Sequence, residues 1–182
     1  MQTFVRSSLR ALALALGFLV LSVQAQVTET PDPVGDALRI LLPLGAAGLA
    51  WYKEDMDGLK QFGVTLVVAQ GTTEVLKHAI DSTRPSGSGY GFPSSHVSAA
   101  FSAAGFVHQR YGVQQALPFY VLATVTAWER VHHHHHFTKD VVGGAAVGLG
   151  SAFLFTHPLP DGSVLSLQMH QGGPWLAYAR SW

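Results

Sequence analysis

The 182-residue sequence contains no cysteine, and only 12% of its residues are charged. The absence of cysteine excludes disulfide bonds, so an exported chain of this kind would depend on packing for its stability. An excess of basic residues is also missing, because 11 lysines and arginines are matched by 11 aspartates and glutamates. This balance argues against a nucleic-acid-binding protein, which typically carries a strongly basic surface.

Long apolar runs are missing beyond the N-terminal region. After residue 25, no segment has the roughly 18 uninterrupted apolar residues that indicate a membrane span. The candidate segments are broken by Arg39, Lys60, Glu74 and His108. The sequence therefore does not require several membrane spans, and it leaves membrane association open.

Residues 1–25 have the features of a secretory signal peptide. Arg6 and Arg10 precede an apolar run, and Val23-Gln24-Ala25 fits a cleavage site. An uncleaved membrane anchor is the alternative, but the polar, proline-containing stretch that follows favours cleavage. We therefore expect an exported, periplasmic protein, either soluble or membrane-associated.

The rest of the chain is predicted to form one all-α domain, a compact bundle of about five helices. Apolar residues recur at helical spacing, and a Gly-, Ser- and Pro-rich loop covers 81–93. Small residues in the third and fifth helices allow close helix contacts. The expected helices cover roughly 36–52, a segment ending near 80, 94–111, 114–130 and 138–155.

Near the C-terminus the periodicity changes from helical to alternating. Leu165, Leu167 and Met169 alternate with polar residues, and a Gln-Gly-Gly turn follows. We predict a short β-hairpin there. The predicted organisation is a signal peptide, a linker, a helical domain and a hairpin tail, at residues 1–25, 26–35, 36–156 and 157–182.

Three clusters of polar residues fall at predicted helix ends. An up-and-down bundle brings the end of its second helix, the start of its third and the junction of its fourth and fifth to one end of the molecule. We therefore expect the three clusters to converge. They are Lys77 with Arg84-Pro85, then Pro93-Ser94-Ser95-His96, and finally Arg130 with His136 and Asp140.

The cations of these clusters predict a phosphate site. Arg84 and Arg130 offer planar guanidinium groups that match phosphate oxygens, and Lys77 adds a point charge. The backbone amides of Ser94 and Ser95, at a helix N-terminus, supply further donors.

Hydrolysis of a phosphomonoester also needs an attacking group, and five consecutive histidines (132–136) are candidates. A histidine can attack phosphorus when a carboxylate holds its other ring nitrogen. Only His136 lies six residues after Arg130 and four before Asp140, which is one helical turn away. The spacing therefore selects His136 as the nucleophile.

Together the clusters resemble the motifs of the type 2 phosphatidic acid phosphatase (PAP2) superfamily, which includes bacterial acid phosphatases and vanadium haloperoxidases. The family pattern is K-x6-RP, PSGH and SR-x5-H-x3-D, and the match covers about residues 71 to 150. The resemblance implies a metal-independent phosphatase that forms a phosphohistidine on His136, with His96 donating a proton to the leaving group. It implies no cofactor, and vanadate would act as a phosphate-mimicking inhibitor.

The proposed roles require His96 to be charged while His136 is neutral. We therefore expect a bell-shaped pH profile, and a flat profile between about pH 5 and 8 would contradict the scheme.

Two residues depart from the family pattern. Ser95 replaces the glycine of PSGH, which would strain a backbone conformation that needs glycine. Glu129 replaces the serine before Arg130, where a carboxylate can orient the guanidinium or weaken the phosphate site. We expect both departures to change substrate range more than activity.

The histidine run also suggests metal binding. Because its fifth member fits the motif spacing, we predict no dedicated metal site and expect 132–135 to be solvated loop residues. A His-rich metal-binding envelope protein is a non-enzymatic alternative, but it leaves Lys77, Arg84 and Asp140 unexplained.

The leading hypothesis is a periplasmic phosphatase that acts on a phosphomonoester or diphosphate, with lipid phosphates favoured by the apolar flanks and by export. The partners expected are a phosphorylated small molecule or lipid, with no nucleic acid. The alternative within the superfamily is a haloperoxidase that holds vanadate as a cofactor on His136, and the small size of the chain argues against it.

Overall fold

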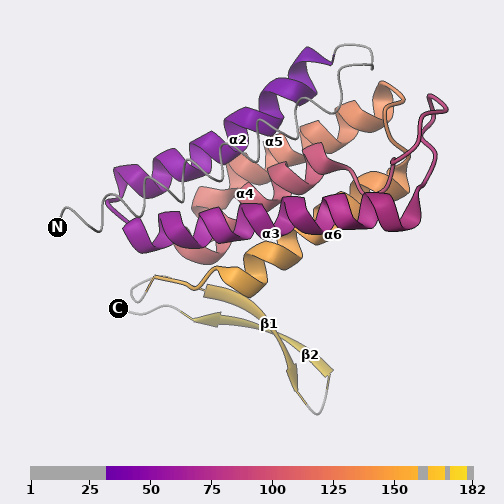
Figure 1. The fold of residues 1–182 in the computed structure, drawn as a ribbon. Helices are drawn as coiled ribbons and strands as arrows, with labels where there is room; N and C mark the ends of the chain where they lie inside the picture. The colour runs from indigo at the N-terminus through magenta and orange to yellow at the C-terminus, as the bar shows by residue number, and fades with distance from the viewer. Residues whose placement is uncertain (1–31, 160–163, 171–172, 180–182) are drawn as a thin grey trace.

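The computed structural model describes residues 32–159, 164–170 and 173–179. The predicted signal peptide therefore lies outside the described residues. Within them the chain forms a helical bundle, as predicted, followed by two strands (Figure 1). The elements are α2 (Pro33–Tyr52), α3 (Met56–Ile80), α4 (Ser95–Tyr111), α5 (Val113–His132), α6 (Thr138–Phe155), β1 (Val164–His170) and β2 (Gly173–Ala179).

Helix α2 begins earlier than the sequence analysis predicted. The predicted linker ended at residue 35, but Pro33 already occupies the first turn of the helix. The Asp32 side chain caps this helix by accepting a hydrogen bond of 3.0 Å from the Gly35 amide. Proline has a fixed φ suited to the first turn and lacks an amide that would need a partner there. An Asp-Pro pair therefore starts the helix, and the predicted linker boundary is wrong by three residues.

Helix α4 lies in the middle of the bundle and packs against α2, α3, α5 and α6 (Figure 1). Its residues are buried nearly all the way round, from Ser95 at its start to Arg110 in its last turn. A helix surrounded in this way needs small side chains, and its buried alanines at positions 99, 100, 103 and 104 meet that need. The aromatic contact between Phe62 and Phe106, with ring centroids 4.7 Å apart, extends this core towards α3.

Glycines let α4 and α6 approach closely. A Cβ atom at Gly144 would lie 2.5 Å from the Ser94 carbonyl oxygen, and one at Gly148 would lie 2.4 Å from the Ser98 carbonyl oxygen. Both contacts are with backbone atoms, which cannot rotate away. The close helix contact predicted from small residues is present, and it fixes α6 against the first turns of α4.

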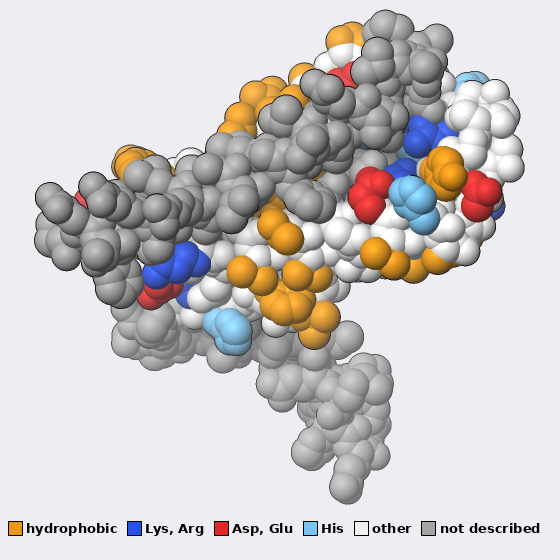
Figure 2. Space-filling view, viewed as in Figure 1, with side chains coloured by type: hydrophobic (Ala, Val, Ile, Leu, Met, Phe, Trp, Pro, Cys, Tyr) orange, Lys and Arg blue, Asp and Glu red, His pale blue; other side chains and the backbone are white. Residues whose placement is uncertain are grey.

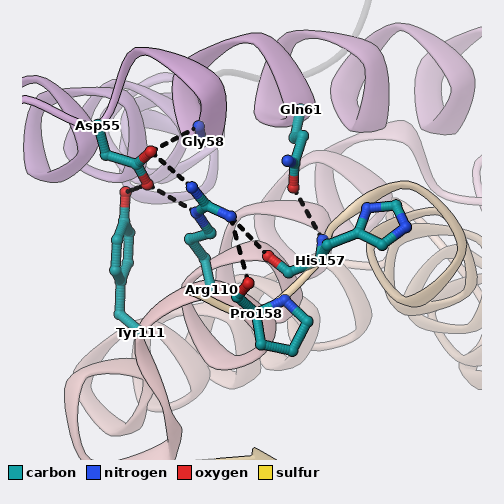
Figure 3. A network of polar contacts seen from close by, with 7 residues as sticks. All are labelled: Asp55, Gly58, Gln61, Arg110, Tyr111, His157 and Pro158. Carbon is teal, nitrogen blue, oxygen red and sulfur yellow. Dashed lines mark hydrogen bonds and ion pairs between the residues drawn. The ribbon is translucent and has the colours of Figure 1, made fainter. Parts of the chain in front are cut away.

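The end of the bundle opposite the predicted site is held by a buried ion pair (Figure 3). Asp55 caps α3 and accepts two hydrogen bonds of 2.6 Å from the Arg110 guanidinium. Arg110 also donates to the carbonyl oxygens of His157 and Pro158, just beyond α6. Tyr111 donates its hydroxyl to the same Asp55 carboxylate. This network ties α3, α4 and the end of α6 together.

The strands β1 and β2 pair antiparallel, with Val164 opposite Ala179 and His170 opposite Gly173. They lie in the segment where the alternation of apolar and polar residues predicts strands.

The outer helices expose many large apolar side chains along their length. Figure 2 shows apolar side chains along the flank of the bundle and charged side chains at its ends. Among the helices of the described residues, α2 is the one long and apolar enough to cross a membrane, a test that buried core helices also pass. The exposed set includes Leu41, Leu44, Val67, Val75, Leu117, Val121, Leu122, Trp128, Val142, Phe153 and Leu154.

Candidate active site

All the predicted site residues lie near one end of the bundle. Lys77 is in the last turn of α3, His96 in the first turn of α4, and Arg130 in the last turns of α5. Asp140 lies in the first turn of α6. Every one of these residues is less than a tenth exposed, as are Arg84, Ser94, Ser95 and His136.

The Lys77 and Arg84 side chains converge on one backbone oxygen. The Lys77 ammonium donates a 2.8 Å hydrogen bond to the Tyr90 carbonyl oxygen, and the Arg84 guanidinium approaches the same oxygen at 3.5 Å. The loop between α3 and α4 is folded back by a bond of 2.6 Å from the Gly91 amide to the Ser82 carbonyl. The two cations thus direct their N–H groups to a shared point, as a phosphate-binding pair requires.

His136 lies beside the carboxylate that the spacing predicted. Its Nδ1 is 3.5 Å from Asp140 Oδ2. Asp140 is itself fixed, because Oδ2 accepts a 2.9 Å hydrogen bond from the Phe137 amide and its carbonyl oxygen accepts one from the Ser94 amide. The start of α6 is thereby joined to the start of α4.

Burial lowers the pKa of His136 to about 4, and the neighbouring charges act in both directions. Asp140 raises this pKa, whereas Arg84, Arg130 and Lys77 each lower it. The predicted cations therefore all lie close enough to act on this imidazole. His136 is neutral at physiological pH, which is the form that can act as a nucleophile.

The second ring nitrogen of His136 is buried and unengaged. Within the described part of the chain, neither ring nitrogen has a hydrogen-bond partner, and Nδ1 has the 3.5 Å contact with Asp140. A buried polar atom without a partner is costly and is typical of a functional site. Nε2 is thus the ring nitrogen that has no contact with Asp140.

Two carboxylates that the sequence analysis did not select also enter the site. Asp32 Oδ2 lies 3.3 Å from the Arg130 guanidinium, and Asp36 Oδ1 lies 3.9 Å from it. Asp36 Oδ1 also lies 2.7 Å from His96 Nε2. Both belong to the start of α2, outside the three clusters, and no spacing within the sequence connects them to His96 or Arg130.

The pKa of His96 is lowered well below its usual value, first by burial and then by Arg130 and Arg39. The hydrogen bond to Asp36 acts in the opposite direction. In turn, the bond to His96 is the main reason that the pKa of Asp36 is lowered. His96 and Asp36 therefore titrate as a pair.

The two departures from the family pattern are accommodated locally. Ser95 is the first residue of α4 and has no positive φ, so it carries no strain of the kind that needs glycine. The Glu129 carboxylate oxygen Oε2 lies 2.9 Å from Nε2 of His133, four residues further along the chain. Its carboxylate is thus engaged by the histidine run.

The histidine run divides into exposed and buried members. His132, His133 and His134 are exposed, and His132 stacks on Trp128 with ring centroids 4.6 Å apart. His135 is buried, so the prediction that it is solvated is wrong. The amides of His135 and His136 both donate to the Arg130 carbonyl, and this tight turn draws both side chains inward. Among the described residues, no group of three or more His, Asp or Glu side chains is placed to hold a metal ion.

A family model described as the PAP2 superfamily matches residues 86–161. The chain is 36% identical over 137 residues to lipid A 4'-phosphatase of Helicobacter pylori strain J99, and the match covers 69% of each chain.

Two solved structures share the fold. The crystal structure of Aquifex aeolicus LpxE has a TM-score of 0.53 at 16% identity, covering 74% of this chain and 92% of the other. A transmembrane PAP2-type phosphatidylglycerolphosphate phosphatase from Bacillus subtilis has a TM-score of 0.53 at 24% identity, covering 85% and 94%. These two likenesses concern the fold alone.

Proposed function

The chain belongs to the PAP2 superfamily of phosphatases, and on that premise we propose that it removes a phosphate monoester group from a lipid through a phosphohistidine on His136. The observation that carries the proposal is the environment of this side chain. His136 lies beside Asp140, and its pKa is lowered first by burial and then by Arg84, Arg130 and Lys77. A neutral imidazole among cations suits attack on a phosphate dianion.

In the first step, Nε2 of His136 attacks phosphorus while the bond from phosphorus to the leaving oxygen breaks. Asp140 accepts a hydrogen bond from Nδ1–H of His136 and stabilises the positive charge that develops on the ring. His96 gives its proton to the leaving oxygen, so the alcohol departs neutral. The cations stabilise the charge on the equatorial phosphate oxygens.

In the second step, water attacks the phosphohistidine. His96, now neutral, takes a proton from this water as the phosphorus–nitrogen bond breaks. Inorganic phosphate leaves, and both histidines return to their initial protonation states. The cycle uses only groups of the chain and water, so we propose that it proceeds without a metal ion.

A lipid substrate is favoured by the curated relative, which is a lipid A 4'-phosphatase, and by the apolar flank of the bundle. The Bacillus subtilis structure of the same fold is a transmembrane PAP2-type phosphatase, and apolar side chains are exposed on the outer helices here as well. We propose that the site lies at a membrane surface on the periplasmic side, where it meets a phosphorylated lipid headgroup. Export follows from the predicted signal and is part of the same proposal.

The proposal is tested by phosphate release from purified protein in detergent micelles. Phosphatidic acid, phosphatidylglycerol phosphate and a 4'-phosphorylated lipid A are offered separately in the presence of EDTA. We expect activity that survives EDTA, is inhibited by vanadate and disappears in His136→Ala. The exposed His132→Ala is the matched control, and it should keep its activity.

Activity lost on chelation would contradict the metal-independent scheme. Bromide oxidation that depends on added vanadate and peroxide, without phosphate release, would instead identify a haloperoxidase.

A further inference from the structure

The start of α2 places a carboxylate against the proposed proton donor. Asp36 Oδ1 lies 2.7 Å from Nε2 of His96, across 60 positions of sequence. The His96 side chain is only 2% exposed, whereas that of Asp36 is 60% exposed. The buried imidazole of His96 is therefore hydrogen-bonded to a carboxylate that is exposed to solvent.

The charged groups that act on His96 come from two helices. Arg39 and Asp36 belong to α2, and Arg130 belongs to α5. Both arginines and the burial of the ring favour the neutral imidazole, and Asp36 alone of the three favours the charged form. A general acid must hold its proton before it can give it away. Without Asp36, His96 would lack the group that retains its proton.

The geometry also assigns the two ring nitrogens of His96. Nε2 is bonded to Asp36, while Nδ1 is buried and has no hydrogen-bond partner among residues 32–159. In the charged ring both nitrogens carry hydrogen. The Nε2–H is held by the carboxylate, so the Nδ1–H is the one that remains for the leaving oxygen.

We propose that Asp36 is a positioning residue that orients and charges His96, so that Nδ1 donates the proton to the leaving group. In the first step this proton moves from Nδ1 to the leaving oxygen, and in the second step Nδ1 takes a proton from the attacking water. Asp36 stays ionised throughout and never touches the substrate. The site then contains two histidine–carboxylate pairs, His136 with Asp140 within α6 and His96 with Asp36 between α4 and α2.

The inference rests on the proposed phosphatase function and is tested by comparing leaving groups. The p-nitrophenolate ion departs without a proton, whereas a simple alkoxide does not. For Asp36→Asn we expect kcat/KM to fall on the order of 100-fold or more with an alkyl phosphate, the usual scale of general acid catalysis. With p-nitrophenyl phosphate the same variant should lose less than about tenfold.

Further variants separate positioning from folding. His96→Ala should show the same dependence on the leaving group, and the double variant should be no worse than His96→Ala, because the two residues act as a unit. Asp36→Glu should recover part of the alkyl phosphate activity. Asp57→Asn, which changes an exposed carboxylate at the opposite end of α3, should match the wild type with both substrates.

The pH profile gives a second measurement. Because the carboxylate favours the charged imidazole, its removal should move the basic limb of kcat/KM with the alkyl phosphate to lower pH. A merely structural role for Asp36 would lower both substrates equally and leave this limb in place.

Each outcome decides between the two proposals. Equal losses with both substrates, or no loss in Asp36→Asn, would overturn the role of Asp36 while leaving an active wild type and an inactive His136→Ala intact. A wild type that releases phosphate from neither substrate would overturn the proposed function, and the inference with it.

Discussion

At the scale of single residues, the two histidines of the site are set apart by their neighbours. His136 lies among three cations and one carboxylate, whereas His96 lies against Asp36 and two arginines. Both are buried, which favours the neutral ring in each case. The proposed difference between donor and nucleophile therefore rests on the carboxylates, since Asp36 lies 2.7 Å from His96 and Asp140 lies 3.5 Å from His136.

The pH dependence of activity follows from these neighbours. The pKa of His136 is lowered to about 4, so activity should rise with pH through that value as the nucleophile becomes neutral. The pKa of His96 is also lowered, so this side chain loses its proton at a lower pH than an ordinary histidine. Activity should therefore fall as the pH rises through the lowered pKa of His96. We expect a bell-shaped curve of kcat/KM with its maximum on the acidic side of about pH 6.5.

The measurement is kcat/KM against pH, calculated for the concentration of substrate dianion. A flat curve, or a maximum above about pH 8, would contradict these assignments.

Residue spacing was sufficient to predict that His136 lies beside Asp140. It was not sufficient for Asp32 and Asp36, because a contact between separate helices leaves no periodic trace in the sequence. The burial of His135 was missed for a related reason. It results from a turn in which successive amides share the Arg130 carbonyl, and five identical residues give no sign of where such a turn begins.

At the scale of elements, the contact between α4 and α6 sets the position of His136, just before α6, relative to His96 in α4. The glycines of α6 allow its backbone to lie against that of α4. The sequence indicated close packing from the run of small residues, and it also predicted most helix bounds within a few positions. It could not indicate which glycine meets which backbone atom, since that depends on the rotation of both helices.

Gly148→Ala is expected to destabilise the fold. The added methyl would meet the Ser98 carbonyl oxygen at 2.4 Å and the Ser102 amide at 2.8 Å, so the helices must separate. Overpacking of this kind costs about 1–3 kcal/mol. Gly150→Ala is the matched control on the same helix, because nothing lies within 4 Å of its added methyl.

Denaturant unfolding of both variants measures this difference. We expect a lower midpoint for Gly148→Ala, and an unchanged or higher one for Gly150→Ala because alanine favours a helix over glycine. Equal stability of the two variants would show that α4 and α6 do not approach as described.

The ion pair between Asp55 and Arg110, at the end of the bundle opposite the site, should contribute to stability without affecting catalysis. Arg110→Ala leaves the buried Asp55 carboxylate without its main partner and frees the backbone after α6. Breaking a buried ion pair by removing one partner costs about 3–5 kcal/mol. We expect a clear loss of thermal stability, with kcat on a lipid phosphate kept near the wild-type value below the unfolding transition. A large loss of kcat in folded Arg110→Ala would indicate coupling between the two ends.

At the scale of the whole molecule, the face in Figure 2 has charged side chains towards the ends of the bundle and apolar side chains between them. The core is small and centred on α4, so the outer helices turn many leucines and valines outward. Exposed apolar residues that form a large contiguous patch are typical of an interaction surface. The sequence left membrane association open because isolated charges interrupt its apolar runs, and the fold buries one of them, Arg39, close to His96.

Membrane association is therefore expected in cells. After lysis the full-length protein should sediment with membranes, resist extraction by high salt and carbonate, and dissolve in detergent. Recovery of the folded protein from the aqueous fraction without detergent would contradict an apolar flank that contacts lipid.

The proposed phosphohistidine on His136 is tested most directly by identifying the residue that is phosphorylated during turnover. Rapid quenching at alkaline pH during turnover of a lipid phosphate, followed by mass spectrometry of peptides, would locate the phosphoryl group. We predict an acid-labile phosphohistidine on His136 in the wild type, and none in His136→Ala. A phosphoryl group on His96 or His135, or full activity in His136→Ala, would contradict the central claim.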